Sequence, residues 1–119
     1  MARILILDDD ANRHEQFAKK YIGEELVHVT VAAEAINYLQ YGNPFDYIFL
    51  DHDLGGMQMV ESGEKTGYEV AEWLSNNPEY KPHMSVILHS LNPVGRKNMC
   101  NVLKKANIHV IESPFLWKT

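Results

Sequence analysis

The chain has 119 residues, of which 45% are hydrophobic and 23% are charged, as expected for one globular domain with a hydrophobic core over residues 1–119. Its net charge of −5 argues against a general DNA- or RNA-binding scaffold, which would carry a basic face. The single cysteine, Cys100, excludes an internal disulfide, and no apolar run reaches the ~18 residues of a membrane span. We therefore expect a cytoplasmic domain with no membrane partner.

The first half of the chain predicts three strands separated by two helices. The strands are apolar or β-branched runs at residues 3–7, 26–31 and 47–50. The first helix follows Asp10, which can cap it, and carries apolar residues at helical spacing: Phe17, Tyr21 and Ile22. The second helix spans residues 32–40, and the segment Gly42-Asn43-Pro44 supplies stop signals after it.

The second half begins with a long loop from Asp51 to about Thr66. Its glycines predict a mobile cover over a site, although a flexible loop without function would show the same pattern: Gly55, Gly56 and Gly63. The remaining elements are a helix over 67–75, a strand over 85–88, a helix that runs from an Asn92 cap to about Lys105, and a strand over 109–111. Five strands that alternate with four helices predict an α/β fold with a parallel sheet.

All six aspartates lie in two short stretches beside apolar runs: Asp8, Asp9 and Asp10, then Asp46, Asp51 and Asp53. The carboxyl ends of neighbouring parallel strands meet at the sheet edge where α/β proteins bind ligands, so we expect Asp8, Asp9 and Asp51 to converge. Each like-charged pair at ~5 Å would repel by about 3 kcal/mol, and a divalent cation would relieve that repulsion. Helix capping and solvated strand ends are the alternative. Asp10 is expected to be a cap and Asp46 a turn residue before a strand.

Two histidines and one helix start could add chemistry at this edge. His52 and His89 follow strands there and could move protons or bind a metal, unless they are buried structural residues. Ser90, Asn92 and Arg96 open a helix whose amide groups could bind phosphate, although capping by Asn92 with Arg96 in solvent is compatible with the same pattern. The other histidines have no evident partners and are expected to be structural or surface residues: His14, His28, His83 and His109.

The two acidic motifs resemble those of the receiver domains of response regulators. Residues 4–10 are similar to a receiver's first strand and acid pair, and residues 46–51 to the strand that delivers its phosphorylated aspartate, here Asp51. Gly67-Tyr68-Glu69-Val70 resembles the start of the receiver's third helix. The resemblance implies a flavodoxin-like three-layer sandwich with strand order 2-1-3-4-5. It also implies Mg²⁺ held by Asp8 or Asp9, Asp51 and the backbone carbonyl of residue 53.

The departures from a receiver are concentrated at the site and at the C-terminus. Ser113 stands where receivers have a lysine that contacts the phosphoryl group, and His89 precedes Ser90, which could replace their threonine or serine. No fifth helix is predicted, so we expect a homodimer, or a tail with Phe115 and Trp117, to cover one face of the sheet. Residues 51–56 and 89–96 resemble the divergent cyclic-phosphate-processing receivers, a group proposed to act on phosphate esters in RNA repair or nucleotide signalling.

From the sequence we favour a metal-dependent phosphoesterase that acts on, or binds, a small phosphate ester such as a cyclic nucleotide or an RNA 2′,3′-cyclic phosphate end. The residues assigned to it are Asp51, His52 and His89 for catalysis, Asp8, Asp9, Asp51 and Asp53 for Mg²⁺ or Mn²⁺, and Ser90, Asn92, Arg96 and Ser113 for phosphate. The alternative is a receiver phosphorylated on Asp51, or a degenerate receiver-like module that binds a nucleotide or a partner without catalysis. Both hypotheses use the same pocket.

Overall fold

The computed structural model describes residues 1–56 and 59–115. Its strands form one parallel sheet in the order β2-β1-β3-β4-β5, which confirms the predicted fold class and strand order. The strands are β1 (Arg3–Leu7), β2 (Glu25–Val29), β3 (Tyr47–Leu50), β4 (Ser85–Leu88) and β5 (Val110–Glu112). The helices are α1 (Ala11–Lys20), α2 (Ala32–Tyr41), α3 (Gly67–Asn76), the 3-10 turn η1 (Pro78–Tyr80) and α4 (Pro93–Lys105). No helix follows β5 within the described residues.

The helix ends follow the capping residues in the sequence. The Asp10 side chain caps α1 by accepting the backbone N–H groups of Asn12 and Arg13 at 2.8 and 3.1 Å, as predicted. Helix α1 then ends at Lys20, and Ile22, which we expected on its apolar face, is 85% exposed. That prediction was wrong because the chain turns toward β2 at Gly23, whose φ of 93° lies in the left-handed region that favours glycine.

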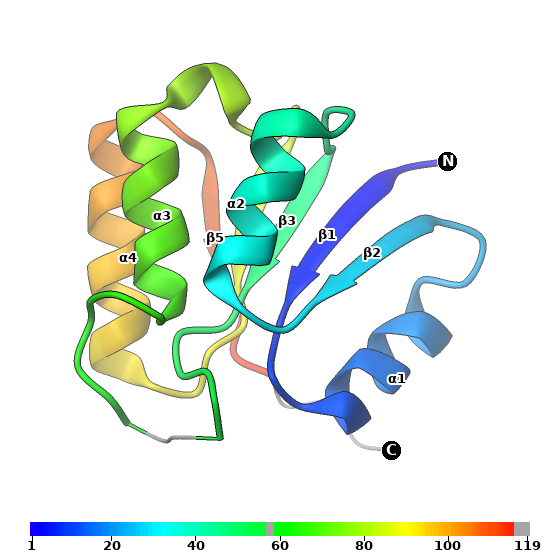
Figure 1. Ribbon diagram of the computed structural model, residues 1–119, viewed down its shortest axis with the longest axis horizontal. Helices are drawn as coiled ribbons and strands as arrows, with labels where there is room; N and C mark the ends of the chain where they lie inside the picture. Colours follow the sequence, from blue (N-terminus) through cyan, green and yellow to red (C-terminus); the bar gives the residue numbers. More distant parts are fainter. Residues whose placement is uncertain (57–58, 116–119) are drawn as a thin grey trace.

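Both faces of the sheet are apolar, as in other parallel sheets that carry helices on each side. Leu5 and Leu7 of β1 belong to the larger core, under α2, α3 and α4. Ile4 and Ile6 alternate with them and belong to the smaller core under α1. Figure 1 shows α2, α3 and α4 side by side and α1 apart from them. No helix in the described residues is long and apolar enough to cross a membrane.

The α1 face is covered in part by the residues that follow β5. Phe115 is only 8% exposed and packs with Ile4, Phe17 and Phe49. It therefore lies where we expected a returning tail, whereas Trp117 lies outside the described residues. A cavity of about 460 Å³ remains on this face, and the homodimer stays a prediction.

Candidate functional site

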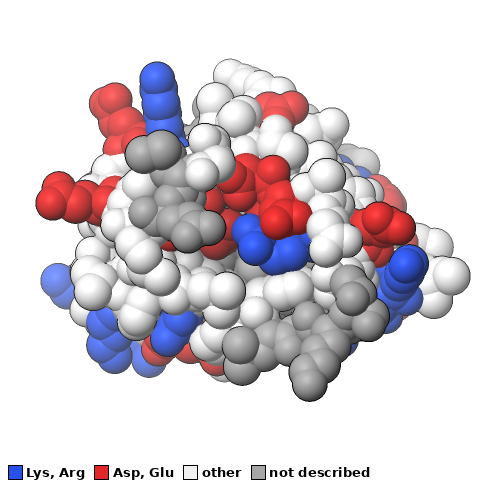
Figure 2. Space-filling model, turned by 90° about the horizontal axis from the view of Figure 1, so that it is seen from below, with Lys and Arg blue, Asp and Glu red and all other residues white. Residues whose placement is uncertain are grey.

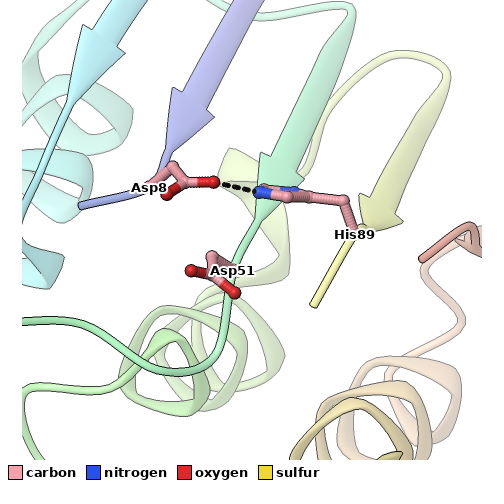
Figure 3. Close-up of side chains that lie close together, drawn as sticks. All are labelled: Asp8, Asp51 and His89. Atoms are coloured by element: carbon pink, nitrogen blue, oxygen red, sulfur yellow. Dashed lines mark hydrogen bonds and ion pairs between the residues drawn. The ribbon is translucent and has the colours of Figure 1, made fainter. Parts of the chain in front are cut away.

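Three side chains from neighbouring strand ends meet at the carboxyl edge of the sheet. Asp8 follows β1, Asp51 follows β3 and His89 follows β4, and the strand register aligns the residues just before them. One nitrogen or oxygen atom from each of the three lies within 4.8 Å of the others (Figure 3). The structure thus brings together two aspartates that the sequence predicted to converge and one of the two predicted histidines.

A pocket of about 400 Å³ opens at this edge, and Asp51 and His89 are among the residues that line it. Figure 2 looks onto this edge and shows acidic atoms gathered around a hollow, with basic atoms beside them. The pocket has a charged part, to which Asp9, Asp51 and Asp53 contribute carboxylates, and an apolar part. The lining is completed by Asp10, Arg13, Gly56, Met59, His89, Leu91 and Phe115.

Asp8 is fully buried, and hydrogen bonds use both of its oxygens. Its Oδ1 accepts the backbone N–H of Asp10 at 2.9 Å and Nη2 of Arg13 at 2.9 Å. Its Oδ2 accepts Nε of Arg13 at 2.7 Å and Nε2 of His89 at 2.8 Å. Burial alone would raise the pKa of Asp8, but the hydrogen bonds from His89 and Arg13 outweigh it and lower the pKa to about 2. Asp8 is therefore a permanent negative charge at neutral pH.

Asp51 has the opposite electrostatic character. Its Oδ1 accepts the backbone N–H of His52 at 2.9 Å, and its Oδ2 lies 3.4 Å from Nη2 of Arg13. Burial and the negative charge of Asp8 raise the pKa of Asp51 to about 7, although Arg13 opposes the rise. A group that is half-protonated near neutral pH and faces a pocket is a functional-site candidate.

The backbone of Asp51 is fixed by the first residue of α3. A Cβ added at Gly67 would lie 1.7 Å from the carbonyl oxygen of Asp51, so no larger residue fits there without movement of the backbone. The Gly67 N–H also donates to the carbonyl of His52 at 2.9 Å. The start of α3 therefore holds the end of β3 at the pocket.

His89 is buried among aromatic rings beside the pocket. It is 2% exposed, and its ring lies 5.3, 6.1 and 6.2 Å from the rings of Phe17, Phe49 and Phe115. Burial lowers the pKa of His89 in spite of Asp8, so the ring is neutral at neutral pH and donates its Nε2–H to Asp8. Its Nδ1 is buried without a hydrogen-bond partner among the described residues.

His52 lies beneath the pocket and does not line it. Its Nδ1 contacts Oδ1 of Asp53 at 2.7 Å, and its Nε2 contacts Oγ of Ser62 at 2.8 Å. The ring is fully buried against α4, where a Cβ added at Gly95 would lie 2.4 Å from it. Burial would raise the pKa of Asp53, but the hydrogen bonds from His52 and Asn92 lower it. His52 therefore positions Asp53, and no ring nitrogen is left free for proton transfer in the pocket.

The four residues expected to bind phosphate do not line this pocket: Ser90, Asn92, Arg96 and Ser113. Asn92 accepts the backbone N–H of Gly95 at 3.0 Å as the cap of α4, and its amide donates to Oδ1 of Asp53 at 3.0 Å. Arg96 donates to the carbonyl of Ser90 at 2.8 Å. Ser113 lines the cavity on the α1 face instead.

Two histidines expected to lack partners contact each other. The Nδ1 atoms of His14 and His28 lie 2.7 Å apart, and Nε2 of His14 lies 2.7 Å from the carbonyl oxygen of Asp8. Burial and the neighbouring His14 lower the pKa of His28. The pair ties α1 and β2 to the chain at Asp8, so these two histidines are structural, as expected, but they have the partners that we did not expect.

Arg13, the basic residue of the pocket, was not predicted from the sequence. Its guanidinium forms two hydrogen bonds with Asp8 and lies 3.7 Å from Asp9, 3.6 Å from Asp10 and 3.4 Å from Asp51. The hydrogen bonds to Asp8 raise the pKa of Arg13. The available signal was an arginine in the first turn after the Asp10 cap, where a side chain can return to the strand end.

The oxygen donors at this edge suit a hard divalent cation. Asp9, Asp51 and Asp53 line the pocket, and carboxylate oxygens are the ligands that Mg²⁺ prefers. Asp8 forms a compact donor group with Asp51 and His89, but its oxygens already accept four hydrogen bonds. Mg²⁺ therefore fits the donor set, with Asp8 as a ligand only if Arg13 moves.

Comparison with known protein families and structures agrees with this architecture. The family model of the cyclic-phosphate processing receiver domain matches residues 3–105. Comparison with curated protein sequences gives no match.

Among solved structures, the chain is similar to chemotaxis protein CheY4 of Vibrio cholerae, with a TM-score of 0.69 and 18% identity over 99% of this chain and 89% of that one. It is also similar to response regulator protein TrrA of Thermotoga maritima, solved in complex with Mg(2+)-BeF. The TM-score there is 0.67, with 23% identity over 98% of this chain and 90% of that one. A CheY-like receiver domain of Methanospirillum hungatei gives a TM-score of 0.63 and 21% identity over 96% and 82%. These likenesses show the fold.

Proposed function

The chain belongs to the cyclic-phosphate processing receiver domains, and on this premise we propose that its acidic pocket holds a phosphoryl group beside a divalent cation, with Asp51 as the accepting carboxylate. The observation that carries the proposal is the position of Asp51. It stands at the end of β3, lines the pocket, and has its Oδ2 3.4 Å from the guanidinium of Arg13. This is the receiver hypothesis that the sequence left as the alternative.

Arg13 answers the main objection that the sequence raised to a receiver function. The objection was that Ser113 replaces the lysine of receivers, which left no cation in the pocket to face the phosphoryl oxygens. Arg13 supplies a permanent positive charge beside Asp51, and a guanidinium can bind two phosphoryl oxygens at once. Charge stabilisation of this kind is commonly worth about 3 kcal/mol or more in such transfers.

The proposed chemistry combines the side chains of the pocket with a small phosphate donor and a divalent cation. An ionised oxygen of Asp51 attacks the phosphorus of a small phosphate donor, the P–O bond to the leaving group breaks, and its electron pair leaves with the donor oxygen. A divalent cation held by Asp9, Asp51 and Asp53, and by Asp8 once Arg13 has withdrawn, would neutralise phosphoryl charge. A bound divalent cation would also favour ionised Asp51, because its pKa of about 7, which already includes the lowering effect of Arg13, leaves it half-protonated near neutral pH.

Phosphorylation with acetyl phosphate and Mg²⁺ tests this proposal. Intact-mass spectrometry should find one added phosphoryl group in the wild type and none in Asp51→Asn. Because acyl phosphates hydrolyse, beryllofluoride binding followed by fluorine NMR provides an independent measurement. A wild-type protein that takes up neither probe would refute the receiver proposal.

Processing of a cyclic phosphate ester is the second candidate, and it retains the ligand class favoured from the sequence. The family match supports it, and so does the buried Asp8–His89 pair, in which a neutral imidazole held by a carboxylate keeps one unpartnered nitrogen. Met59, Leu91 and Phe115 give the pocket an apolar part that could contact a nucleoside. The test is a chromatographic screen of 2′,3′-cyclic nucleotides, 3′,5′-cyclic nucleotides and RNA 2′,3′-cyclic ends with Mg²⁺ or Mn²⁺. Turnover that disappears in His89→Gln would favour this candidate.

A further inference from the structure

The guanidinium of Arg13 occupies the centre of the acidic group. It contacts Asp8 through two hydrogen bonds, and three more carboxylates lie within 3.7 Å. Of the described residues that line the pocket, Arg13 is the only lysine or arginine. Arg13 therefore relieves part of the repulsion between these carboxylates, a role that we had expected a divalent cation to fill.

The contact with Asp8 blocks a metal ligand. An ionised carboxylate has about four acceptor positions, and the four bonds from Arg13, His89 and Asp10 take them. A cation can bind Asp8 only after the guanidinium withdraws, because both are positive and use the same oxygens. Two of the four bonds come from the one flexible side chain of the set, Arg13.

Arg13 reaches the pocket from the surface of α1 and is more exposed than the buried aspartates that it contacts. Its side chain is 26% exposed, while that of Asp8 is fully buried and that of Asp51 is 8% exposed. Its guanidinium lies 5.9 Å from the centre of the Phe115 ring, so the arginine also contacts the apolar part of the pocket. Asp8 and Asp51, by contrast, follow directly from buried strands that fix them.

We propose that Arg13 is a built-in counter-ion that a divalent cation must displace from Asp8, and that the released guanidinium then serves the phosphoryl group. The proposal rests on the function proposed above and adds a sequence of events to it. Arg13 opposes metal binding in the empty pocket and supports phosphoryl binding once the metal is present. Its removal therefore has opposite effects on the two ligands, whereas loss of a merely structural residue would weaken both.

Calorimetric titration of Mg²⁺ into the wild type, Arg13→Gln and Arg3→Gln tests the first half. Arg3 provides a matched control because it starts β1 at the other end of the sheet, where it pairs with Glu25. We expect Arg13→Gln to bind Mg²⁺ more tightly by about tenfold or more, since it lacks the competing charge. Arg3→Gln should bind as the wild type does. Arg13→Lys keeps the charge but cannot form the paired hydrogen bonds, so its Mg²⁺ affinity should lie between those of the wild type and Arg13→Gln.

Beryllofluoride binding at saturating Mg²⁺ tests the second half, and here Arg13→Gln should bind more weakly by roughly tenfold. Circular dichroism and a cooperative thermal unfolding transition check that each variant is folded, and the Mg²⁺-induced rise in the unfolding temperature gives a second measure of Mg²⁺ affinity. The inference fails if Arg13→Gln has unchanged or weaker Mg²⁺ affinity, even where the wild type accepts beryllofluoride and the receiver function stands. If neither the wild type nor Arg13→Gln binds Mg²⁺, the inference and the metal-assisted function both fail.

Discussion

Nε2 of His89 lies 2.8 Å from Oδ2 of Asp8, and this contact between two buried side chains joins the ends of β1 and β4 across the end of β3. The aspartate keeps the imidazole in one tautomer, and the imidazole satisfies part of a buried negative charge. The pair is thus a structural element of the pocket whether or not His89 transfers protons.

Replacement of His89 by alanine should therefore destabilise the fold. The substitution leaves a void between Phe17, Phe49 and Phe115 and removes a donor from Asp8, which together should cost about 2–4 kcal/mol. Urea unfolding measures the loss. His83→Ala is the control, because its side chain is 63% exposed, and it should change stability by less than about 0.5 kcal/mol. Equal stabilities of the two variants would contradict a structural role for His89.

The raised pKa of Asp51 predicts a pH-dependent gain in stability for Asp51→Asn in metal-free protein. The folded-state pKa is about 7 against an ordinary 3.8, so between these values the folded state binds a proton that the unfolded chain does not. The stabilisation that protonated Asp51 contributes to the wild type is therefore present at low pH and is lost as the pH rises toward 7. Asp51→Asn should be more stable than wild type by on the order of 2 to 4 kcal/mol at pH 8, with the difference vanishing near pH 4.

Urea unfolding between pH 4 and 8 with a chelator present measures this difference. Asp46→Asn provides a control of opposite sign, because the hydrogen bond from the Arg3 backbone and the contact with His83 lower the pKa of Asp46. The Asp46 variant should be less stable than the wild type throughout this pH range, because a lowered pKa keeps the folded-state carboxyl ionised down to pH 4 and the stabilisation is lost only below the ordinary aspartate pKa. A pH-independent difference for Asp51→Asn would show that its carboxyl titrates normally in the folded state.

Strand-end positions could be predicted from the sequence because they follow from backbone geometry alone. Once the runs before Asp8 and Asp51 are identified as neighbouring parallel strands, their carboxylates must meet at one edge. Position 113 shows the limit of this reasoning. Successive residues of an extended chain point to opposite faces, so a residue at the right edge can still face the wrong side. Ser113 does so, and it lines the cavity on the α1 face.

Arg13 and His52 could not be placed in this way because their positions depend on tertiary packing. Arg13 reaches the carboxylates only because α1 sets its side chain back toward the strand end. His52 follows the same strand as Asp51, but the tight approach of α4 at Gly95 buries its ring. Helix-to-sheet distances of this kind are not encoded in hydrophobic periodicity.

Phe115 should be essential for the stability of the α1 face. It is almost fully buried with Ile4, Phe17 and Phe49, so Phe115→Ala should cost about 3–4 kcal/mol through lost burial and the cavity left behind. Ile22→Ala is the matched control, since Ile22 is 85% exposed, and it should cost less than about 0.5 kcal/mol. Unfolding by urea compares the two, and a loss below about 1 kcal/mol for Phe115→Ala would mean that the residue does not cover this face in solution.

Replacement of Gly95 by alanine should have two effects of opposite sign on the stability of the fold. In an open helix position, alanine would stabilise α4 by up to about 1 kcal/mol relative to glycine. Here an added Cβ would lie 2.4 Å from the His52 ring, so Gly95→Ala should instead destabilise the fold by about 1–3 kcal/mol. Gly63→Ala, where nothing lies within 4 Å of the added Cβ, should be neutral or slightly stabilising.

A double-mutant cycle then identifies the cause. Because His52→Ala removes the ring that the new methyl group meets, Gly95→Ala should cost at least about 1 kcal/mol less in that background than in the wild type. The ring also holds Asp53 through Nδ1, so Gly95→Ala alone should weaken Mg²⁺ binding by displacing that carboxylate. Additive unfolding energies across the cycle would mean that the helix and the ring do not contact each other, and unchanged Mg²⁺ affinity in Gly95→Ala would mean that Asp53 keeps its position when the ring is displaced.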